Sequence, residues 1–307
     1  IGTGRMGQAY YDLLRKKKIN TIGFLDNSKN NLKKFKAKNK ISSKKIFFSS
    51  KNFFKIKNID LIVISTTTDY HYSYIEMALK INIKYILVEK PLCLSIKEHI
   101  NLNKIAKKNN VNIFIDYPFI YSGTIKYLKN VITRKKFGKL RSIESYREQA
   151  PIRTDTNVLW DLSIHDISII SYLLDIKKME IKNIIKNNKK KINYDKIQFN
   201  LLSKSGIGIF IKNNWKSPTK IRFMKFIFDK ATLYCDENET LYKIKIYKSF
   251  KNKFNQHTLE IPKIDLTEPL TNLANYILKS LSKNKRTGLN DKFNLSITKL
   301  MILLDNK

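Results

Sequence analysis

Apolar and polar residues follow two different spacings along the first 117 residues of this 307-residue chain. Short runs rich in Ile, Val, Leu and Phe have the length of buried strands, and between them apolar residues recur every three to four positions, as on one face of a helix. The expected strands cover residues 21–26, 45–48, 60–66, 84–89 and 111–117. The expected helices cover residues 5–17, 31–38, 72–81 and 96–109. This alternation predicts a parallel sheet with helices on both of its faces.

The pattern changes after residue 117. Helices are expected over residues 123–134 and 158–174, with a strand over residues 139–148 between them. The chain then reads as consecutive strands over residues 180–185, 196–203, 207–211, 221–228, 231–235 and 241–247, followed by helices over residues 270–281 and 291–304. Strands that follow one another without helices between them favour one large antiparallel sheet. The Asn- and Lys-rich run at residues 187–191 is expected to form a solvated hairpin tip.

These elements predict two domains, which the length of the chain allows. The first is an α/β Rossmann domain with a doubly wound parallel sheet and covers residues 1–118. The second is an α+β domain with a large, mostly antiparallel open sheet and covers residues 119–307. Because Ile1 stands directly before a glycine motif, the first strand is expected to be truncated at its N-terminal end.

The glycine motif Gly2-x-Gly4-x-x-Gly7 stands between a strand end and the first expected helix. Glycines allow a tight turn and a close approach of the backbone to a pyrophosphate, which the N-terminus of the helix then faces with unpaired N–H groups. Asp26 follows Gly7 by 19 residues, at a strand end where a carboxylate can accept hydrogen bonds from ribose hydroxyls and would repel a 2′-phosphate. Two nearby lysines leave room for NADP, but NAD is favoured. The expected cofactor contacts here are Gly2, Gly4, Arg5, Met6, Gly7 and Asp26.

Two further loops follow strand ends at the same edge of the expected sheet. The loop at residues 65–71 offers hydroxyls and amides that could line the cofactor, although the same residues could simply cap the next helix. Glu89-Lys90-Pro91 follows the next buried strand, and a lysine there lies at the mouth of the cofactor cleft, where desolvation could lower its pKa. The expected cofactor contacts in these loops are Ser65, Thr66, His71, Glu89 and Lys90.

Asp161 and His165 are four residues apart in an expected helix, so they share a face. An aspartate beside a histidine can orient the ring and stabilise the imidazolium, as a general acid or base requires. The alternative is a hydrogen-bonded pair with a structural role at a domain interface. We expect Lys90, Asp161 and His165 to be the catalytic residues, and the sequence does not rank Lys90 against His165 as the principal acid or base. No metal is expected.

The formal net charge is +35, yet the basic residues do not indicate a nucleic-acid site. Of the 60 basic residues 52 are Lys and 8 are Arg, and they are spread along the whole chain, whereas readers of bases and phosphates use clustered arginines. We expect no specific nucleic-acid partner. The longest apolar run has strand length, so no membrane span is expected. Two cysteines, Cys93 and Cys235, favour a reducing compartment, the cytoplasm.

Residues 2–7, the loop at residues 65–71, Glu89-Lys90-Pro91 and the stretch Trp160-Asp161-x-x-x-His165-Asp166 together resemble the Gfo/Idh/MocA oxidoreductases, over essentially the whole chain. The resemblance implies NAD(P)-dependent oxidation or reduction of a sugar or cyclitol hydroxyl. It also implies that Lys90, Asp161 and His165 work on the reacting hydroxyl. Residues 116–121 and 157–166 resemble members from surface-polysaccharide pathways, which implies a nucleotide sugar such as a UDP-N-acetylhexosamine.

The expected function is transfer of a hydride between NAD and a hydroxyl or keto carbon of a sugar, namely a nucleotide sugar in polysaccharide biosynthesis. A free sugar, an inositol or a trans-diol is the alternative substrate, and an inactive regulator that senses a cofactor or metabolite is an alternative of another class. The resemblance, together with a broad open sheet whose apolar face needs covering, implies a homo-dimer or homo-tetramer. Two arginines could bind a substrate phosphate or form surface salt bridges. The candidate substrate contacts are Tyr117, Arg147, Arg153 and Trp160.

Overall fold

The computed structural model describes residues 1–177, 179–187, 194–249, 257–283 and 291–307. The chain divides into two compact units. Unit 1 comprises Ile1–Asp116 and Thr271–Thr298, and unit 2 comprises Tyr117–Leu270 and Lys299–Lys307. A search of the described helices finds none with the length and hydropathy that a bilayer span needs.

Unit 1 is built on parallel strands that the first residues of the chain join together. The strands are β1 (Phe24–Leu25), β2 (Ile46–Phe47), β3 (Leu61–Ile64), β4 (Tyr85–Val88) and β5 (Asn112–Ile115). β1 pairs with β2, and β4 pairs with β3 and β5, all in parallel. Gly2 N donates to Leu25 O at 2.8 Å and Ile1 N donates to Val63 O at 2.6 Å, so the first residues lie between β1 and β3. The spatial order β2, β1, residues 1–2, β3, β4, β5 is that of a doubly wound Rossmann sheet, as the sequence predicted.

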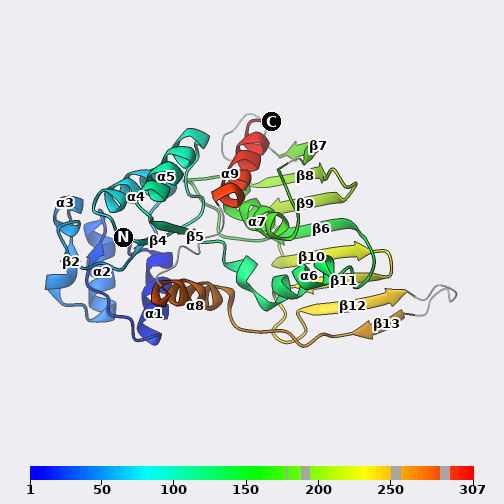
Figure 1. Ribbon diagram of the computed structural model, residues 1–307, viewed down its shortest axis with the longest axis horizontal. Coiled ribbons are helices and arrows are strands. Elements are labelled where there is room, and N and C mark those ends of the chain that lie inside the picture. The colour runs from blue at the N-terminus through cyan, green and yellow to red at the C-terminus, as the bar shows by residue number, and fades with distance from the viewer. Residues whose placement is uncertain (178, 188–193, 250–256, 284–290) are drawn as a thin grey trace. The chain divides into compact units, whose positions relative to one another are not determined.

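Helices cover both faces of this sheet. They include α1 (Arg5–Lys16), α2 (Lys29–Asn39), α3 (Ser50–Phe53), α4 (His71–Lys80) and α5 (Ile96–Lys108). Figure 1 shows α4 and α5 on one side of β4 and α1 on the other. α2 shows why such Lys-rich segments fold as helices: it buries Leu32 and Phe35 in a cluster with Phe24, and its lysines face solvent.

The C-terminal helices differ from the expected domain division, which assigned every residue after 118 to the second domain. They are α8 (Pro269–Ser282) and α9 (Asp291–Asp305), and residues 271–298 group with unit 1. The Tyr276 ring packs edge-on against Phe114 with centroids 6.1 Å apart, and Tyr85 donates to Ser280 O at 3.2 Å. The apolar face of α8 is therefore buried in the first unit. This packing depends on contacts between segments far apart in the sequence, which local patterns do not predict.

Unit 2 contains one eight-stranded sheet (Figure 1). Its strands are β6 (Leu140–Glu148), β7 (Glu180–Lys186), β8 (Lys196–Leu202), β9 (Gly208–Asn214), β10 (Ile221–Phe228), β11 (Ala231–Asp236), β12 (Ile244–Ser249) and β13 (His257–Glu260). Their order is β13-β12-β11-β10-β6-β9-β8-β7, and every neighbouring pair is antiparallel except β6 and β9. The predicted large, mostly antiparallel sheet is confirmed. The four-residue β13 was not expected, and residues 188–191 of the expected hairpin tip lie outside the described residues.

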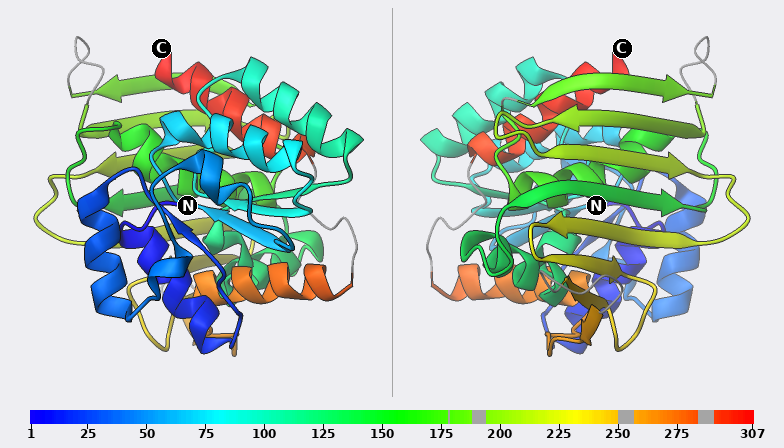
Figure 2. Two further views of the ribbon diagram at one scale, coloured as in Figure 1. Left: turned by 90° about the vertical axis from the view of Figure 1, so that its left-hand side faces the viewer. Right: turned by 90° about the vertical axis from the view of Figure 1, so that its right-hand side faces the viewer.

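One face of this sheet is covered by helices α6 (Gly123–Thr133) and α7 (Ile164–Leu173), and Figure 2 (right) views the sheet from the opposite side. Burial alternates along the strands accordingly: on β10, Met224 and Phe226 are buried, whereas Phe223 and Lys225 are half-buried. A π-turn over Leu159–Ser163 precedes α7, so the expected helix over residues 158–174 is not α-helical throughout. π-turns inside helices are frequent at functional sites.

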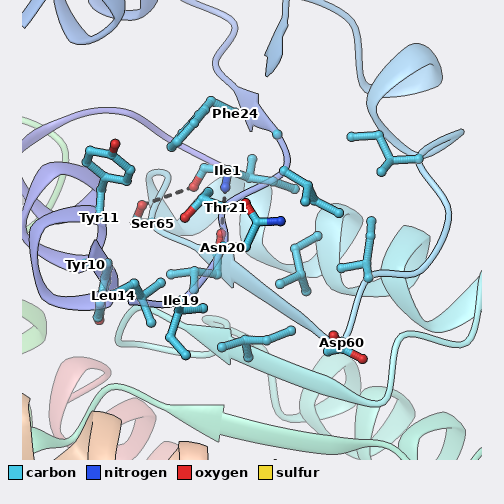
Figure 3. Close-up of a pocket in the computed structure, with 18 of the residues that line it drawn as sticks. Ile1, Tyr10, Tyr11, Leu14, Ile19, Asn20, Thr21, Phe24, Asp60 and Ser65 are labelled. Atoms are coloured by element: carbon cyan, nitrogen blue, oxygen red, sulfur yellow. Dashed lines mark hydrogen bonds between the residues drawn. The ribbon is translucent and has the colours of Figure 1, made fainter. Parts of the chain in front are cut away.

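A cavity of about 450 Å³ opens in unit 1 beside the first residues of the chain (Figure 3). Residues 18–24 and 58–63, at the amino ends of β1 and β3, form much of its wall, together with Tyr10, Tyr11 and Leu14 of α1. Ligands of doubly wound sheets bind at the carboxyl ends of the strands. This cavity is therefore not the expected dinucleotide site.

Candidate active site

Each glycine of the motif Gly2-x-Gly4-x-x-Gly7 meets a different requirement. Gly2 has a φ of +85°, and a Cβ there would lie 2.6 Å from Ser65 O. A Cβ on Gly7 would lie 2.0 Å from Gly2 O, so α1 packs directly on the turn. A Cβ on Gly4 would meet nothing within 4 Å. Open space therefore borders Gly4 at the N-terminus of α1, where the first N–H groups lack intrahelical acceptors, and this arrangement fits a pyrophosphate.

Asp26 lies beside this turn and stabilises it through hydrogen bonds. The Asp26 Oδ2 atom accepts hydrogen bonds from Thr3 N and Thr3 Oγ1, both at 2.7 Å, and Oδ1 accepts one from Ser28 N at 2.8 Å. The residue is buried. Each carboxylate oxygen has two lone pairs, so Oδ1 retains one acceptor position for a ribose hydroxyl.

The loop after β3 is tied to the turn after β4. Ser65 Oγ donates to Gly2 O at 2.9 Å. His71 is fully buried, with Nδ1 2.8 Å from Pro91 O and Nε2 3.1 Å from Thr66 O. Burial lowers the pKa of His71. Both ring nitrogens lie against backbone carbonyls, so His71 joins the two loops. Because the side chain is fully buried, it exposes no atom that could contact the cofactor directly, as had been expected.

Lys90 follows β4, at the edge where Ser65 follows β3 and Asp116 follows β5. Its side chain is half-buried. Burial raises the pKa of the neighbouring Asp116 carboxyl, and the charge of Lys90 opposes this rise only in part. Tyr10 of α1 reaches the same place and contacts both Glu89 and Asp116. The Glu89 carboxylate therefore binds the Tyr10 hydroxyl.

Asp161 and His165 lie in unit 2, across the junction between the π-turn and α7. The Asp161 carboxylate accepts a hydrogen bond from Trp215 Nε1 at 2.9 Å and pairs with Arg153 at 3.4 Å. The His165 ring is half-buried and packs edge-on against Phe119, with centroids 5.1 Å apart. Because a π-turn holds more residues than an α-turn, the sequence spacing alone does not place this pair as the expected α-helix would.

Arg147 is neither a surface residue nor an accessible anion contact. It is 3% exposed and pairs with Asp166 at 3.0 Å and with Glu237 at 3.2 Å. Its guanidinium lies 4.6 Å from the centroid of the Phe119 ring. The expected contact with a substrate phosphate is therefore wrong for Arg147, because its donors bind the buried carboxylate of Asp166 and the half-buried carboxylate of Glu237.

The other candidate substrate residues differ in how accessible they are. Tyr117 is 1% exposed. Trp160 is buried, and its Nε1 donates to Asp305 Oδ2 at 2.7 Å, so the indole is anchored to α9. Arg153 has a side chain that is 38% exposed and pairs with Asp155 at 2.6 Å. Of these four expected residues, Arg153 alone is both exposed and close to Asp161.

Sequence reasoning missed four residues that shape these clusters, namely Tyr10, Asp116, Phe119 and Trp215. Asp116 ends a strand at the same edge as Lys90, and that position was a usable signal. Trp215 lies 54 residues from Asp161, and no local pattern announces its contact. Within the described ranges, no group of three or more His, Cys, Asp and Glu side chains is placed to hold a metal ion.

The sequence of residues 1–117 matches the GFO_IDH_MocA model, an oxidoreductase family with an NAD-binding Rossmann fold. The match covers the first 117 of the 307 residues, and over these residues the chain is similar to the Gfo/Idh/MocA oxidoreductases. The match confirms the resemblance drawn from the glycine motif and the Glu89-Lys90-Pro91 turn. Among curated proteins, none matches the chain.

Several solved structures of oxidoreductases share the fold of this chain over nearly its whole length. UDP-N-acetylglucosamine 3-dehydrogenase GnnA from Acidithiobacillus ferrooxidans is 17% identical over 99% of this chain and 95% of its own, with a TM-score of 0.81. KijD10, a 3-ketoreductase from Actinomadura kijaniata solved with NADP and TDP-benzene, is 11% identical over 98% and 94%, with a TM-score of 0.81. An oxidoreductase from Agrobacterium radiobacter solved with NAD+, L-tartaric acid and magnesium is 15% identical over 98% and 92%, with a TM-score of 0.80.

Proposed function

We propose that the chain is an NAD-dependent oxidoreductase that moves a hydride between nicotinamide and a hydroxyl or keto carbon of a sugar. The observation that carries the proposal is the open backbone at Gly4, beside Asp26 and at the same sheet edge as Lys90. The family match to residues 1–117 supports the cofactor class.

Named residues would hold the cofactor. The N-terminus of α1 at Gly4, Arg5 and Met6 would hold the pyrophosphate, Gly2 and Gly7 would give the turn its shape, and Asp26 would bind the ribose. The loop residues Ser65 and Thr66 line the nicotinamide half, with His71 and Glu89 holding the loop and Lys90 in place. When bound, the cofactor supplies or accepts the hydride.

The residues proposed to move the proton are Lys90, Asp161 and His165. His165 takes the hydroxyl proton at an imidazole nitrogen, and Asp161 stabilises the resulting positive charge. The Lys90 ammonium stabilises the developing oxyanion by charge and hydrogen bonding. Lys90 and His165 could exchange these tasks.

The proposed substrate is a nucleotide sugar of a polysaccharide pathway. GnnA is a UDP-N-acetylglucosamine dehydrogenase by name, and KijD10 is a ketoreductase solved with a TDP ligand. Arg153, exposed and next to Asp161, is the proposed phosphate contact in place of Arg147. A free sugar, an inositol or a trans-diol is the alternative substrate.

NAD is the proposed cofactor because Asp26 presents a carboxylate where NADP carries a 2′-phosphate. Relatives in fold have been solved with either cofactor. The two buried free thiols, Cys93 and Cys235, support the proposal that the protein works in the reducing cytoplasm.

The open sheet face is proposed to pair with a second copy of this chain. Half-buried aromatic rings follow one another across five strands of this face: Phe210, Tyr146, Phe223, Tyr234 and Tyr247. Two lysines of this face are paired with carboxylates: Lys225 with Glu144 at 3.1 Å and Lys212 with Glu148 at 2.7 Å. In a chain of net charge +35, such pairing reduces the repulsion between two copies that meet at this face.

The deciding experiment is a fluorescence titration of the protein with NADH and NADPH, followed by turnover assays with UDP-N-acetylglucosamine and with myo-inositol. NADH binding with turnover of the nucleotide sugar is the expected result. Turnover of myo-inositol alone selects the alternative substrate. Binding without any turnover, unchanged in His165→Asn, favours the inactive regulator. No binding of either cofactor overturns the proposal.

A further inference from the structure

A tyrosine and two carboxylic acid side chains, all buried, form a cluster next to Lys90. All three belong to unit 1. Tyr10 comes from α1, Glu89 from the end of β4 and Asp116 from the end of β5. They are 4%, 9% and 3% exposed, respectively. The Tyr10 hydroxyl lies 3.0 Å from Glu89 Oε1 and 2.5 Å from Asp116 Oδ2.

The number of hydrogen atoms in this cluster limits its charge. A tyrosine hydroxyl has one hydrogen, so it can donate to only one of two carboxylates. If both carboxylates were ionised, the Tyr10 oxygen would face the second carboxylate with no hydrogen between them. The lone pairs of the two oxygens would then repel each other at a buried site. A proton on one carboxyl turns that contact into a hydrogen bond, because this carboxyl then donates to the Tyr10 oxygen while Tyr10 donates to the other carboxylate.

Asp116 is the better holder of that proton. Its Oδ1 atom is buried and has no hydrogen-bond partner among the described residues. An ionised carboxylate with an unpartnered buried oxygen is costly, whereas a neutral carboxyl tolerates it. Burial and, next, the charge of Glu89 raise the pKa of Asp116, and Tyr10 and Lys90 oppose them. The charged and titratable groups acting on Asp116 are therefore Tyr10 from α1 and Glu89 and Lys90 from the turn after β4.

We propose that Asp116 carries a proton at neutral pH, donated toward Tyr10, and that this proton limits the cluster facing Lys90 to a single negative charge on Glu89. Asp116 is a positioning residue for Lys90. If Asp116 ionises, a second negative charge acts on the Lys90 ammonium and stabilises it. The role of Lys90 rests on the proposed function, whereas the proton on Asp116 does not.

The proton is tested directly by infrared spectroscopy at pH 7 on the full chain without substrate. The carbonyl stretch of a protonated carboxyl group is expected in the wild-type protein and is expected to be lost in Asp116→Asn. The band persists in the control Asp12→Asn, which changes an exposed carboxylate on the same helix as Tyr10. It weakens in Glu89→Gln, because loss of the neighbouring negative charge lets Asp116 ionise. A wild-type spectrum without this band, or one that Asp116→Asn leaves unchanged, overturns the proposal.

The effect on Lys90 is tested by the pH dependence of turnover. Because asparagine resembles a protonated aspartate, Asp116→Asn is expected to keep kcat within about threefold at pH 7. Its alkaline limb is expected to move to lower pH by about one unit, which is a tenfold rate difference beyond the limb. A merely structural role would lower kcat at every pH without moving the limb. If the protein proves to have no dehydrogenase activity, the infrared result still decides whether Asp116 holds the proton.

Discussion

The Asp26 carboxylate binds Thr3 through two hydrogen bonds to the same oxygen, one from the backbone N–H and one from the hydroxyl, both 2.7 Å long. Asp26 thus supports the glycine turn as well as offering an acceptor to a ribose. A substitution at Asp26 therefore affects both the shape of the turn and the choice of cofactor, and the two effects need different measurements.

Asp26→Asn is expected to weaken NADH binding by about 10- to 100-fold, since a hydrogen bond to a charged group is worth roughly 1.5–3 kcal/mol. NADPH binding should weaken less, because the repulsion of its 2′-phosphate is removed together with the carboxylate. The measurement is the ratio of the two dissociation constants from fluorescence titrations. Damage to the turn alone lowers both affinities equally, so an unchanged ratio would contradict a role for Asp26 in cofactor choice.

Gly4→Ala and Gly7→Ala form a matched pair within one turn. The methyl group that Gly4→Ala adds meets no protein atom within 4 Å, so the free energy of unfolding of this variant is expected to stay within about 1 kcal/mol of the wild-type value, the usual scale for a residue at a helix N-cap. Its NADH affinity should fall at least about tenfold, because the methyl group takes the space proposed for the pyrophosphate.

Gly7→Ala is expected to behave differently, because its methyl group would lie 2.0 Å from a backbone oxygen. The backbone oxygen of Gly2 cannot move aside as the end of a flexible side chain can. The free energy of unfolding should therefore fall by about 3 kcal/mol. Urea denaturation separates the two variants. Equal stability of both, or normal NADH binding by Gly4→Ala, would refute the assignment of the open space at Gly4 to a ligand.

Local spacing and turn chemistry predicted much of this fold. The 3.6-residue period of α1 and the apolar runs of β3 and β4 require no knowledge of the rest of the chain. The carboxyl ends of parallel strands share an edge, so Ser65 and Lys90 could be placed together from the strand order alone. The π-turn before α7 and the packing of α8 on Phe114 could not be predicted, since both depend on contacts between distant segments.

Arg147 shows the same limit at the level of a single side chain. An arginine in a strand with many polar residues is expected at the surface. Arg147 is buried instead, and its charge is paired there with Asp166 and Glu237. These partners lie 19 and 90 residues away in sequence. Burial of a charge is set by such distant partners, and for this reason the expected role of Arg147 was wrong.

Arg147→Met is expected to lower the free energy of unfolding by about 3–5 kcal/mol, because Asp166 then remains buried without its cation. The double variant Arg147→Met/Asp166→Asn should recover part of this loss, since Asn213 can still bond to residue 166. Urea denaturation of both variants measures the difference. A double variant less stable than the single one would show that the charge pair is not the cause.

Folding stability should fall in mild acid because of His99. This side chain is fully buried, its Nδ1 lies 2.8 Å from Thr298 Oγ1, and burial lowers its pKa to about 4. Between pH 6.5 and 4 the unfolded chain binds a proton that the folded chain does not. The stabilising contribution is therefore complete above pH 6.5 and is lost as the pH falls, by roughly 3 kcal/mol in total.

Comparison with His99→Gln isolates this contribution from that of other groups. Glutamine has no charge to gain, so its unfolding free energy should decline less between pH 6.5 and 4 than that of the wild type. Urea denaturation at several pH values gives both curves. Parallel curves would mean that His99 is not responsible for the acid sensitivity.

The aromatic face of the unit 2 sheet should decide the oligomeric state. Phe223 lies between Tyr146 and Tyr234, with ring centroids 6.2 Å and 5.7 Å away, so it occupies the middle of the row. A charge at this position would be buried without a partner in any face-to-face pair, and such a burial costs several kcal/mol. Phe223→Glu is therefore expected to convert a dimer or tetramer into a monomer in light-scattering measurements at micromolar protein concentration.

The matched control is Phe48→Glu, because Phe48 is an exposed phenylalanine of unit 1 and lies outside the sheet face. This control should keep the mass of the wild-type assembly, and circular dichroism should show both variants folded. A wild-type protein that is monomeric under the same conditions would leave the aromatic row without the proposed partner. A Phe223→Glu variant that stays assembled would place the interface on another surface, since an unpaired carboxylate cannot remain at the centre of a close-packed contact.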